Sequence, residues 1–342
     1  MAALILIIIA LAAFAVSWAV TNALVTVLRK HMMDQPTSRS SHIVPTPRGG
    51  GLGIIAGLAA GLVAACFLSA PVPPWRLLAG TALMAAVGFA DDRVRGLPAT
   101  VRLLLQFAAA ALVVVPAERF SLFPLPPPLD FSVGPFALPL ALLWVVGVTN
   151  VYNFLDGIDG YAATQGLIGG AAIALADLSG PLAPAALALA GACAGFLIHN
   201  WHPAKVFMGD VGAAALGFFF AAVPFHLPGA RQSDMILLVA LALWFFLTDG
   251  IYTFIRRLIR GEKVWQAHRS HLYQRLVISG LRHDQVVIRI ALASAFLAGG
   301  AALGIAHRCA GGMWGILLCA TLLFVTLLLW TLRRERSLRN AA

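Results

Sequence analysis

Long apolar runs follow one another along almost the whole chain, and no other feature constrains its fold as strongly. A helix rises about 1.5 Å per residue, so crossing about 30 Å of hydrocarbon takes about 20 apolar residues. The runs lie near residues 3–27, 50–70, 76–90, 101–116, 137–153, 162–179, 185–200, 211–228, 235–254, 287–306 and 312–331. Because a backbone in lipid must satisfy its own hydrogen bonds, they predict an all-α polytopic membrane protein. We expect about 11 transmembrane helices, folded as a single integral-membrane domain over residues 1–342.

The composition agrees with this fold class. Of the 342 residues, 60% are hydrophobic and only 11% are charged, which is far from the composition of a soluble domain. The run at 3–27 lacks a basic start and is too long for the apolar part of a signal peptide, so we expect it to be the first span. The four cysteines lie in or beside apolar runs without a C-x-x-C spacing, which predicts neither a disulfide framework nor a cysteine zinc site.

Lysine and arginine concentrate in alternate gaps between the runs, and this sets the expected orientation. The basic gaps and the tail hold Arg29, Lys30, Arg39, Arg48, Arg93, Arg95, Arg102, Lys205, Arg256, Arg257, Arg260, Lys263, Arg269, Arg275, Arg282, Arg333, Arg334, Arg336 and Arg339. The other gaps hold Arg76, Arg119, Arg231 and Arg308. Loops rich in lysine and arginine stay in the cytoplasm, so we expect a periplasmic N-terminus and a cytoplasmic C-terminus, with 255–286 as the longest cytoplasmic segment. The same rule, with attraction to anionic lipid, explains the net charge of +10 without nucleic acid.

Carboxylates are scarce in this chain, and five of them gather in the gaps predicted to be cytoplasmic. The chain has 14 acidic residues, among them Asp91, Asp92, Asp156, Asp159 and Asp210. A carboxylate next to a bilayer is costly unless it is paired, hydrated or bound to a cation, which makes such a residue a candidate for function. We therefore expect the five to form one magnesium-dependent site.

The first two acids are adjacent. Asp91 and Asp92 end an apolar run, and neighbouring residues on a helix point about 100° apart, so both can project into one polar cleft. Paired carboxylates raise each other's pKa, which suits proton abstraction or metal binding. The alternative is a charged helix end balanced by Arg93 and Arg95.

The gap that contains Asp156 and Asp159 is more specific. Asn153 and Asp156 are three residues apart and are expected to share a helical face. A glycine follows each acid, which lets the backbone turn or approach a ligand closely. No packing requirement calls for two Asp-Gly pairs at the edge of a membrane helix, so the pattern favours a binding site.

The gap from Asn200 to Gly212 places Asp210 between two glycines, with Lys205 close by. Phe207 precedes the acid by three residues, where a base could stack on its ring. Lysine and Mg²⁺ are common partners of phosphates, and Mg²⁺ prefers a few carboxylates together with water and phosphate oxygens.

Two basic segments suit phosphate. Arg48 precedes the glycine-rich start of a helix, whose free N–H groups attract anions, although an ordinary interfacial loop is an equal alternative. In the longest predicted cytoplasmic segment, His268 and His271 are expected on one helical face. Because no third zinc ligand is evident nearby, phosphate binding beside Arg269 is the better interpretation, with a lipid-facing basic helix as the alternative.

Taken together, these motifs resemble the polyprenyl-phosphate N-acetylhexosamine-1-phosphate transferases, of the glycosyltransferase family 4 type. That superfamily includes the phospho-MurNAc-pentapeptide translocase and enzymes that start O-antigen, enterobacterial common antigen and teichoic acid linkage units. The resemblance covers most of the chain, from the Pro-Thr-Pro-Arg-Gly-Gly segment to His271, and rests on four ordered motifs. It implies about ten or eleven helices around a cytoplasmic active cleft, in the inner membrane of a bacterium.

The resemblance also implies roles for single residues. Asp91 and Asp92 match the essential aspartate pair that supplies the candidate base on the lipid phosphate, and Asp210 matches a ligand of Mg²⁺, for which Mn²⁺ is a common substitute. The residues implied at the nucleotide-sugar site are Asn153, Asp156, Asp159, Asn200 and Phe207. Those expected to contact phosphate are Arg48, Lys205, His268 and His271.

The implied reaction transfers N-acetylhexosamine 1-phosphate from a UDP-sugar of the GlcNAc, FucNAc or QuiNAc type to undecaprenyl phosphate, with release of UMP. The separated histidines differ from the consecutive histidines of the peptidoglycan translocase, which favours a role in starting O-antigen and thus lipopolysaccharide. The sequence does not choose the sugar, the base within the Asp91–Asp92 pair, or direct attack over a covalent intermediate, and it is compatible with a homodimer.

Two other classes of membrane protein are alternatives to this transferase family. A transporter of nucleotide sugars or lipid-linked sugars would carry charges near the bilayer midplane and often two related halves. A phosphotransferase that uses CDP-activated alcohols would have a long pattern of aspartates on one helix, which this sequence lacks.

Overall fold

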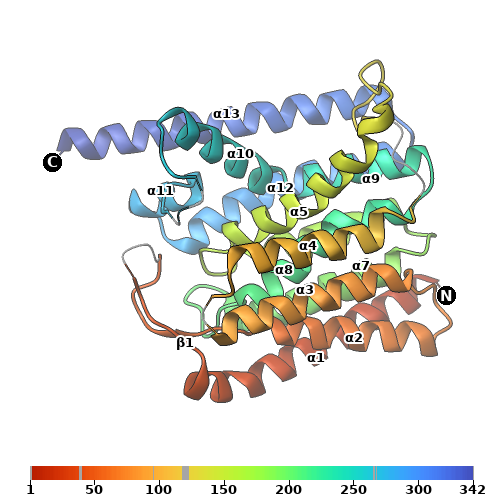
Figure 1. Cartoon of the computed structure of the whole chain (residues 1–342), viewed down its shortest axis with the longest axis horizontal. Coiled ribbons are helices and arrows are strands. Elements are labelled where there is room, and N and C mark those ends of the chain that lie inside the picture. The colour runs from red at the N-terminus through yellow and green to blue at the C-terminus, as the bar shows by residue number, and fades with distance from the viewer. Residues whose placement is uncertain are drawn as a thin grey trace.

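The computed structural model describes residues 2–37, 41–94, 96–117, 123–264, 266 and 268–341, which form a helical bundle (Figure 1). The helices are α1 (Ala2–His31), α2 (Gly51–Phe67), α3 (Trp75–Val94), α4 (Ala99–Val114), α5 (Ala137–Leu155), α6 (Tyr161–Ala176), α7 (Ala183–Asn200), α8 (Gly209–Ala222), α9 (Ala230–Ala242), α10 (Trp244–Ile259), α11 (Leu272–Ile278), α12 (His283–Ala306) and α13 (Ala310–Ala341). Two short 3-10 helices, η1 (Gly134–Phe136) and η2 (Val223–His226), and an antiparallel pair of strands, β1 (Met33–Asp34) and β2 (Thr46–Pro47), complete the described elements.

Every predicted apolar run is helical, but one run differs from the expected single span. The run at 235–254 breaks at Leu243 into α9 and α10, which meet at 75°. Composition cannot reveal this break, because Leu243 is itself apolar and neither proline nor glycine adjoins it. The bend turns α10 toward α11, where Asp249 of α10 accepts the N–H groups of Leu272 and Tyr273 at 2.9 and 3.3 Å.

The chain is a multi-pass membrane protein by the length and polarity of its helices. Within the described residues, six helices are long and apolar enough to cross a membrane, or seven if α9 and α10 count as one broken span. The helices α2, α4 and α6 are apolar but shorter. The expected number of spans and the expected orientation therefore stay predictions. Arg39, Arg95 and Arg119, which contribute to the expected orientation, lie outside the described residues, as does the side chain of Arg339.

Glycines bring α3, α2 and the start of α8 into close contact. A Cβ atom on Gly88 of α3 would lie 2.2 Å from the carbonyl oxygen of Asp210, and one on Gly51 of α2 would lie 2.5 Å from Gly212. Only glycine permits backbones to approach this closely. Because Asp92 follows Gly88 by one helical turn, the same crossing directs Asp92 at the first turn of α8.

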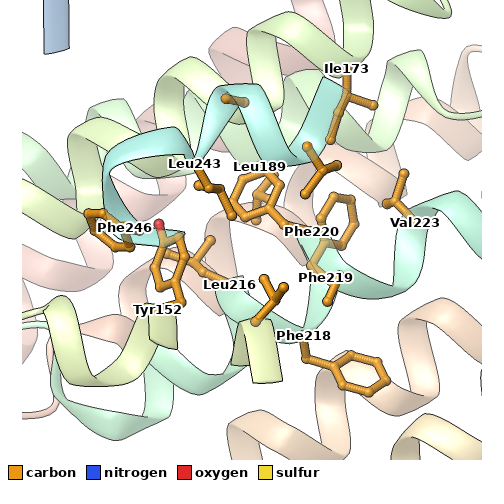
Figure 2. Packing of buried hydrophobic residues seen from close by; sticks show 14 of the residues in the cluster. Tyr152, Ile173, Leu189, Leu216, Phe218, Phe219, Phe220, Val223, Leu243 and Phe246 are labelled. Atoms are coloured by element: carbon orange, nitrogen blue, oxygen red, sulfur yellow. The ribbon is translucent and has the colours of Figure 1, made fainter. Parts of the chain in front are cut away.

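An aromatic core lies between α5, α6, α8 and the bent pair α9–α10. Figure 2 shows the rings of Tyr152, Phe220 and Phe246 grouped with Leu216 and Leu243. The ring centroids of Tyr152 lie 5.0 Å from Phe246 and 5.9 Å from Phe220, and the Tyr152 hydroxyl donates to the carbonyl of Ala162 at 2.7 Å. This packing fixes the end of α5, from which Asn153 and Asp156 project.

Candidate active site

Two polar cavities open at the end of the bundle where α3 and α5 finish and α8 begins. The first, called the central pocket, has a volume of about 310 Å³. It is lined by Asp34, Thr37, Ser41, His42, Arg48, Asn153, Phe154, Asp156, Gly157, Ile158, Asp159, Asn200, Phe207, Met208, Gly209, Asp210, His268, Tyr273, Gln274 and His283. The second, called the side pocket, has a volume of about 490 Å³. It is lined by His31, Met32, Met33, Asp34, Gln35, Arg48, Asp91, Asp92, Arg93, Gly96, Arg102 and Asp210.

Arg48 and Asp210 lie where the two pockets meet. The guanidinium of Arg48 pairs with the carboxylate of Asp210, and its Nε atom lies 2.6 Å from Oδ1 of Asp92. Arg102 approaches the same point, with Nη1 3.7 Å from Oδ2 of Asp210 and 3.2 Å from Oδ2 of Asp91. Two arginines thus face three carboxylates, and Asp210 is accessible from both pockets.

Asp92 caps the first turn of α8. Its two carboxylate oxygens accept the N–H groups of Asp210 and Val211 at 3.0 and 3.1 Å, and its side chain is fully buried. The first N–H groups of a helix have no partner within the helix. A carboxylate placed there accepts hydrogen bonds from them, and its negative charge is stabilised by the positive end of the helix dipole. Asp92 therefore fixes the position of Asp210 as well as the charge beside it.

Asp91 lies against the turn between α3 and α4. Its carboxylate accepts the N–H of Leu97 and contacts Arg102. The prediction that Asp91 and Asp92 project into one cleft is confirmed, since both line the side pocket. Neither is among the described residues that line the central pocket. The adjacent acids therefore face Asp210 from the side opposite to the Asp-Gly motif.

Asn153 and Asp156 face the central pocket from the end of α5, as expected for residues three apart. Asn153 lies in the last turn, and Asp156 follows the last helical residue. Burial and the nearby carboxylates of Asp210 and Asp92 raise the pKa of Asp156 to about 7, against the opposing effect of Arg48. A cation that binds beside Asp156 would lower this pKa again, so that the carboxyl group carries its negative charge.

Asp159 is held by groups from two other parts of the chain. Its Oδ2 atom lies 2.6 Å from Nδ1 of His202 and 3.3 Å from Nδ1 of His283, and it accepts the N–H of Ala204 at 3.2 Å. Burial acts to raise the pKa of Asp159, but the contacts with both histidines outweigh burial and lower it. Asp159 is therefore an anion at neutral pH.

Asn200 joins two turns at the wall of the central pocket. Its side-chain oxygen accepts the N–H of Gly160 at 3.0 Å, and its side-chain nitrogen donates to the carbonyl of Val206 at 2.9 Å. The amide of Asn200 is thus already bonded within the protein, although the residue lines the pocket. Its structural role is to hold the 156–160 turn against the 201–208 turn.

Phe207 is fixed beside Arg48 by backbone hydrogen bonds. Its N–H donates to Pro47 at 2.8 Å, and its carbonyl accepts the N–H of Gly50 at 2.9 Å. The ring packs edge-on against His42 at a centroid distance of 4.8 Å, and both rings line the central pocket. Lys205, in contrast, is exposed and is not among the described residues that line either pocket.

The expectation that His268 and His271 share a helical face is wrong. His268 lies in the loop before α11, and His271 is the residue that precedes its first turn. The helix begins there because the buried carboxylate of Asp249 accepts the first N–H groups of α11, and Nδ1 of His271 lies 3.4 Å from Oδ1 of Asp249.

The rings of His268 and His271 still lie close together, with centroids 4.9 Å apart. Burial and the neighbouring His271 and Arg257 lower the pKa of His268 to about 4, so its ring is uncharged at neutral pH. His268 lines the central pocket as a neutral hydrogen-bonding group. His271 is not among the described residues that line it.

Four residues of the central pocket escape prediction from the sequence, His42, Tyr273, Gln274 and His283, as does Asp249, which supports the start of α11. Asp249 carried a usable signal, since an acid inside an apolar run is unusual. His283 carried none, because it lies 124 residues after Asp159 and only the packing of α12 brings them together. Tyr273 and Gln274 follow the histidine motif directly, where a helix start could have been considered.

Comparison with known proteins gives an independent result. A model of the family described as "Glycosyl transferase family 4" matches residues 74–227, the segment that holds all five aspartates. The probable undecaprenyl-phosphate N-acetylglucosaminyl 1-phosphate transferase of Bacillus subtilis (strain 168) is 32% identical over 267 residues, which are 76% of this chain and 74% of that protein.

Two further relatives extend the comparison. The decaprenyl-phosphate N-acetylglucosaminephosphotransferase of Mycobacterium tuberculosis (strain ATCC 25618 / H37Rv) is 34% identical over 311 residues, covering 79% of this chain and 75% of the relative. The phospho-N-acetylmuramoyl-pentapeptide-transferase of Halalkalibacterium halodurans is 30% identical over 271 residues, covering 71% of this chain and 78% of the relative.

Proposed function

The chain belongs to glycosyl transferase family 4, and we propose that it transfers N-acetylhexosamine 1-phosphate from a UDP-sugar to undecaprenyl phosphate, with release of UMP. The printed names of its relatives support a phosphosugar transfer to a polyprenyl phosphate. The observation that carries the proposal is the position of Asp210, which borders two polar pockets at the end of an apolar bundle.

The central pocket is the proposed site of the UDP-sugar. It offers the ring of Phe207 for stacking of a base, the carboxylates of Asp156 and Asp210, and the guanidinium of Arg48 for the diphosphate. The names of the relatives favour GlcNAc as the sugar over the FucNAc and QuiNAc types. The start of O-antigen synthesis remains the proposed cellular role.

An apolar groove beside the central pocket is the proposed site of the prenyl chain. The groove has a volume of about 240 Å³ and is lined by Val151, Phe154, Leu155, Gly250, Ile251, Phe254, Arg257, Val264, His268 and His271. Phe154 and His268 also line the central pocket, so the two cavities adjoin. The bend at Leu243 creates this groove, because it places α10 beside the end of α5. A lipid whose tail lies there would have its phosphate beside Asp210, which also borders the side pocket lined by Asp91.

Asp91 and Asp92 are assigned different parts in the reaction. Asp92 uses both oxygens to hold Asp210, Val211 and Arg48, so we assign it a positioning role. Asp91, whose side chain is 7% exposed whereas that of Asp92 is 0% exposed, is the better candidate for the group that keeps the lipid phosphate deprotonated. A phosphate oxygen of the lipid attacks the β-phosphorus of the UDP-sugar, the bond to the UMP oxygen breaks, and UMP leaves with the electron pair. Catalysis of this type rests mainly on positioning and charge neutralisation.

A divalent ion is part of the proposal, and the residues at Asp210 fit one. Asp210, Asp156 and Asn153 all line the central pocket, and their side chains carry oxygens of the kind that Mg²⁺ prefers as ligands. Asp210, with Asp156 beside it, would hold Mg²⁺ or Mn²⁺, and the ion bound there would neutralise charge on the diphosphate.

The test is release of UMP from UDP-GlcNAc by the purified protein with undecaprenyl phosphate and Mg²⁺, followed by a panel of UDP-N-acetylhexosamines. We expect UMP only when lipid, sugar nucleotide and Mg²⁺ are all present. Asp234→Asn, an exposed change at the start of α9, is the matched control for each aspartate variant. Uptake of intact UDP-sugar into proteoliposomes without UMP release would replace this proposal with a transporter.

A further inference from the structure

One cluster of chemically active side chains lies outside the group around Asp210. Asp159 belongs to the turn between α5 and α6, His202 to the turn between α7 and α8, and His283 is the first residue of α12. One ligand atom from each side chain, a carboxylate oxygen or an imidazole nitrogen, lies within 4.8 Å of the other two. Three separate segments of the chain thus converge on one point.

The hydrogen bonds inside the cluster leave one lone pair, on Nδ1 of His283, beside the carboxylate of Asp159. The backbone N–H of Asp159 donates to Nδ1 of His283 at 3.3 Å, so that nitrogen presents a lone pair. The same nitrogen lies 3.3 Å from the carboxylate oxygen Oδ2 of Asp159. Two lone-pair atoms at this distance repel each other unless a positive charge lies between them. A proton or a metal ion between the two atoms removes this repulsion, and a metal ion can also bind the neighbouring Nδ1 of His202.

We propose that Asp159, His202 and His283 form a binding site for a divalent transition-metal ion of the Zn²⁺ class, separate from the site at Asp210. Two imidazole nitrogens and one carboxylate oxygen match the ligands that Zn²⁺ and its neighbours take, whereas Mg²⁺ prefers oxygen ligands alone. The proposal does not depend on the reaction assigned above, because it rests only on these three side chains.

The distances fit such an ion with a small adjustment. A tetrahedral ion with bonds of about 2.0–2.1 Å keeps its ligand atoms roughly 3.3 Å apart. Nδ1 of His283 already lies 3.3 Å from Oδ2 of Asp159. Nδ1 of His202 lies 2.6 Å from the same oxygen and would have to move outward by less than about 1 Å. This ring is the least restricted of the three groups, because its side chain is 30% exposed, whereas those of Asp159 and His283 are each 8% exposed.

The surroundings support the ligands and leave one position open. The N–H of Ala204 donates to Oδ2 of Asp159 at 3.2 Å, as outer hydrogen bonds commonly orient a ligating carboxylate. Asp159 and His283 also line the central pocket, so the fourth ligand position of the ion faces that pocket and is available to water. Binding of the ion would connect the start of α12 with the 156–160 turn and the 201–208 turn, the two turns that Asn200 joins.

The test measures Zn²⁺ binding directly. The protein is stripped with a chelator, placed in buffer with excess Mg²⁺ to occupy the Asp210 site, and titrated with Zn²⁺ in a calorimeter. In parallel, Co²⁺ is added and its visible absorption recorded, because tetrahedral Co²⁺ absorbs far more strongly than octahedral Co²⁺. The variants are His202→Asn, His283→Asn and the double variant, with His268→Asn as the matched control in the same pocket.

We expect one high-affinity Zn²⁺ per chain and the strong Co²⁺ absorption. Loss of either histidine of the cluster should weaken binding on the order of 100-fold, while the His268→Asn protein binds as the unchanged protein does. Absence of Zn²⁺ binding by the unchanged protein, or equal binding by the double variant, would overturn the proposal. His202→Asn keeps the test valid if His283→Asn does not fold, since His202 is partly exposed. Chelator-treated protein should also unfold at a lower temperature, an effect absent from the double variant.

Discussion

Asp177 and Asp210 lie at opposite ends of the helix bundle, and each is a carboxylate that pairs with an arginine. Asp177 uses one oxygen for Arg231 and the other for the N–H of Leu182 at 2.8 Å, and its side chain is 1% exposed. Asp210 contacts two arginines, lies among other carboxylates and is 14% exposed at the junction of two pockets.

The difference between the two ends shows what separates a structural acid from a functional one in this protein. At Asp177 the negative charge is matched and closed off, so the pair stabilises the turn after α6. At Asp210 the carboxylates outnumber the arginines that contact them, which leaves capacity for a further cation. Both acids are mostly buried, but only Asp210 of the two borders the central pocket and the side pocket.

The largest expected effect is on Asp210 itself. Asp210→Asn removes the charge that borders both pockets, and we expect the rate of UMP release to fall on the order of 10²- to 10³-fold. The fold should persist, because asparagine has the same shape. Steady-state assay with thermal unfolding as the fold control makes the measurement, and full activity in this variant would remove Asp210 from the proposed metal site.

Asp92→Asn comes next. The change weakens the cap on α8 and the pairing with Arg48, and we expect activity to fall about 10- to 100-fold because Asp210 is no longer held in place. Asp91→Asn, made alongside, should change the pH dependence of the rate as well as its size. If the two variants had the same pH profile, the division of roles between the two acids would be contradicted.

Asp177→Asn is the counterpart at the far end of the bundle. It should leave the rate of UMP release within about twofold, but lower the free energy of unfolding by about 1–3 kcal/mol, since it weakens the ion pair and the backbone hydrogen bond of a buried carboxylate. Denaturant unfolding in a mild detergent gives the stability, and the same assay gives the rate. A large loss of activity without a loss of stability would mean that the two ends do not differ as described.

A pH dependence should mark the excess of carboxylates. The pKa of Asp156 lies at about 7 in the folded protein against an ordinary value of 3.8, so the folded state binds a proton more tightly than the unfolded state. Stability of the metal-free protein should therefore fall as pH rises from about 4 to about 7. Thermal unfolding in chelator should show this slope, and Asp156→Asn should reduce it, leaving the part due to Asp210, whose carboxyl group lies among the same carboxylates. Saturating Mg²⁺ should oppose it, because the ion favours the charged carboxylate.

Among the pocket residues, the smallest expected effect is at His268. Since its pKa lies at about 4, the ring carries no charge at neutral pH, and His268→Gln should reduce activity less than about tenfold. The pH profile above about 5 should not change. A lost ionisation near neutral pH in this variant would show that the histidine acts as a cation on phosphate.

Much of the fold was predictable, because long apolar runs report on single helices. Every predicted run is helical in the structure. The break at Leu243, however, could not be predicted, because a bend stabilised by Asp249 and the start of α11 depends on packing between distant segments. Asn153, Asp156, Asp159, Asn200, Phe207 and Asp210 all line the central pocket, as expected from motifs whose spacing is local.

What the sequence determined by itself is the set of helices and the end of the bundle at which scarce acids gather, because hydrophobicity and short spacings are properties of neighbouring residues. The tertiary structure alone decided the partners. Arg48 meets Asp210 across 162 residues, and His283 meets Asp159 across 124. These pairings arise because α2 and α3 pack closely on α8 and α12 packs on α6, and glycines such as Gly88 allow the closest of these approaches.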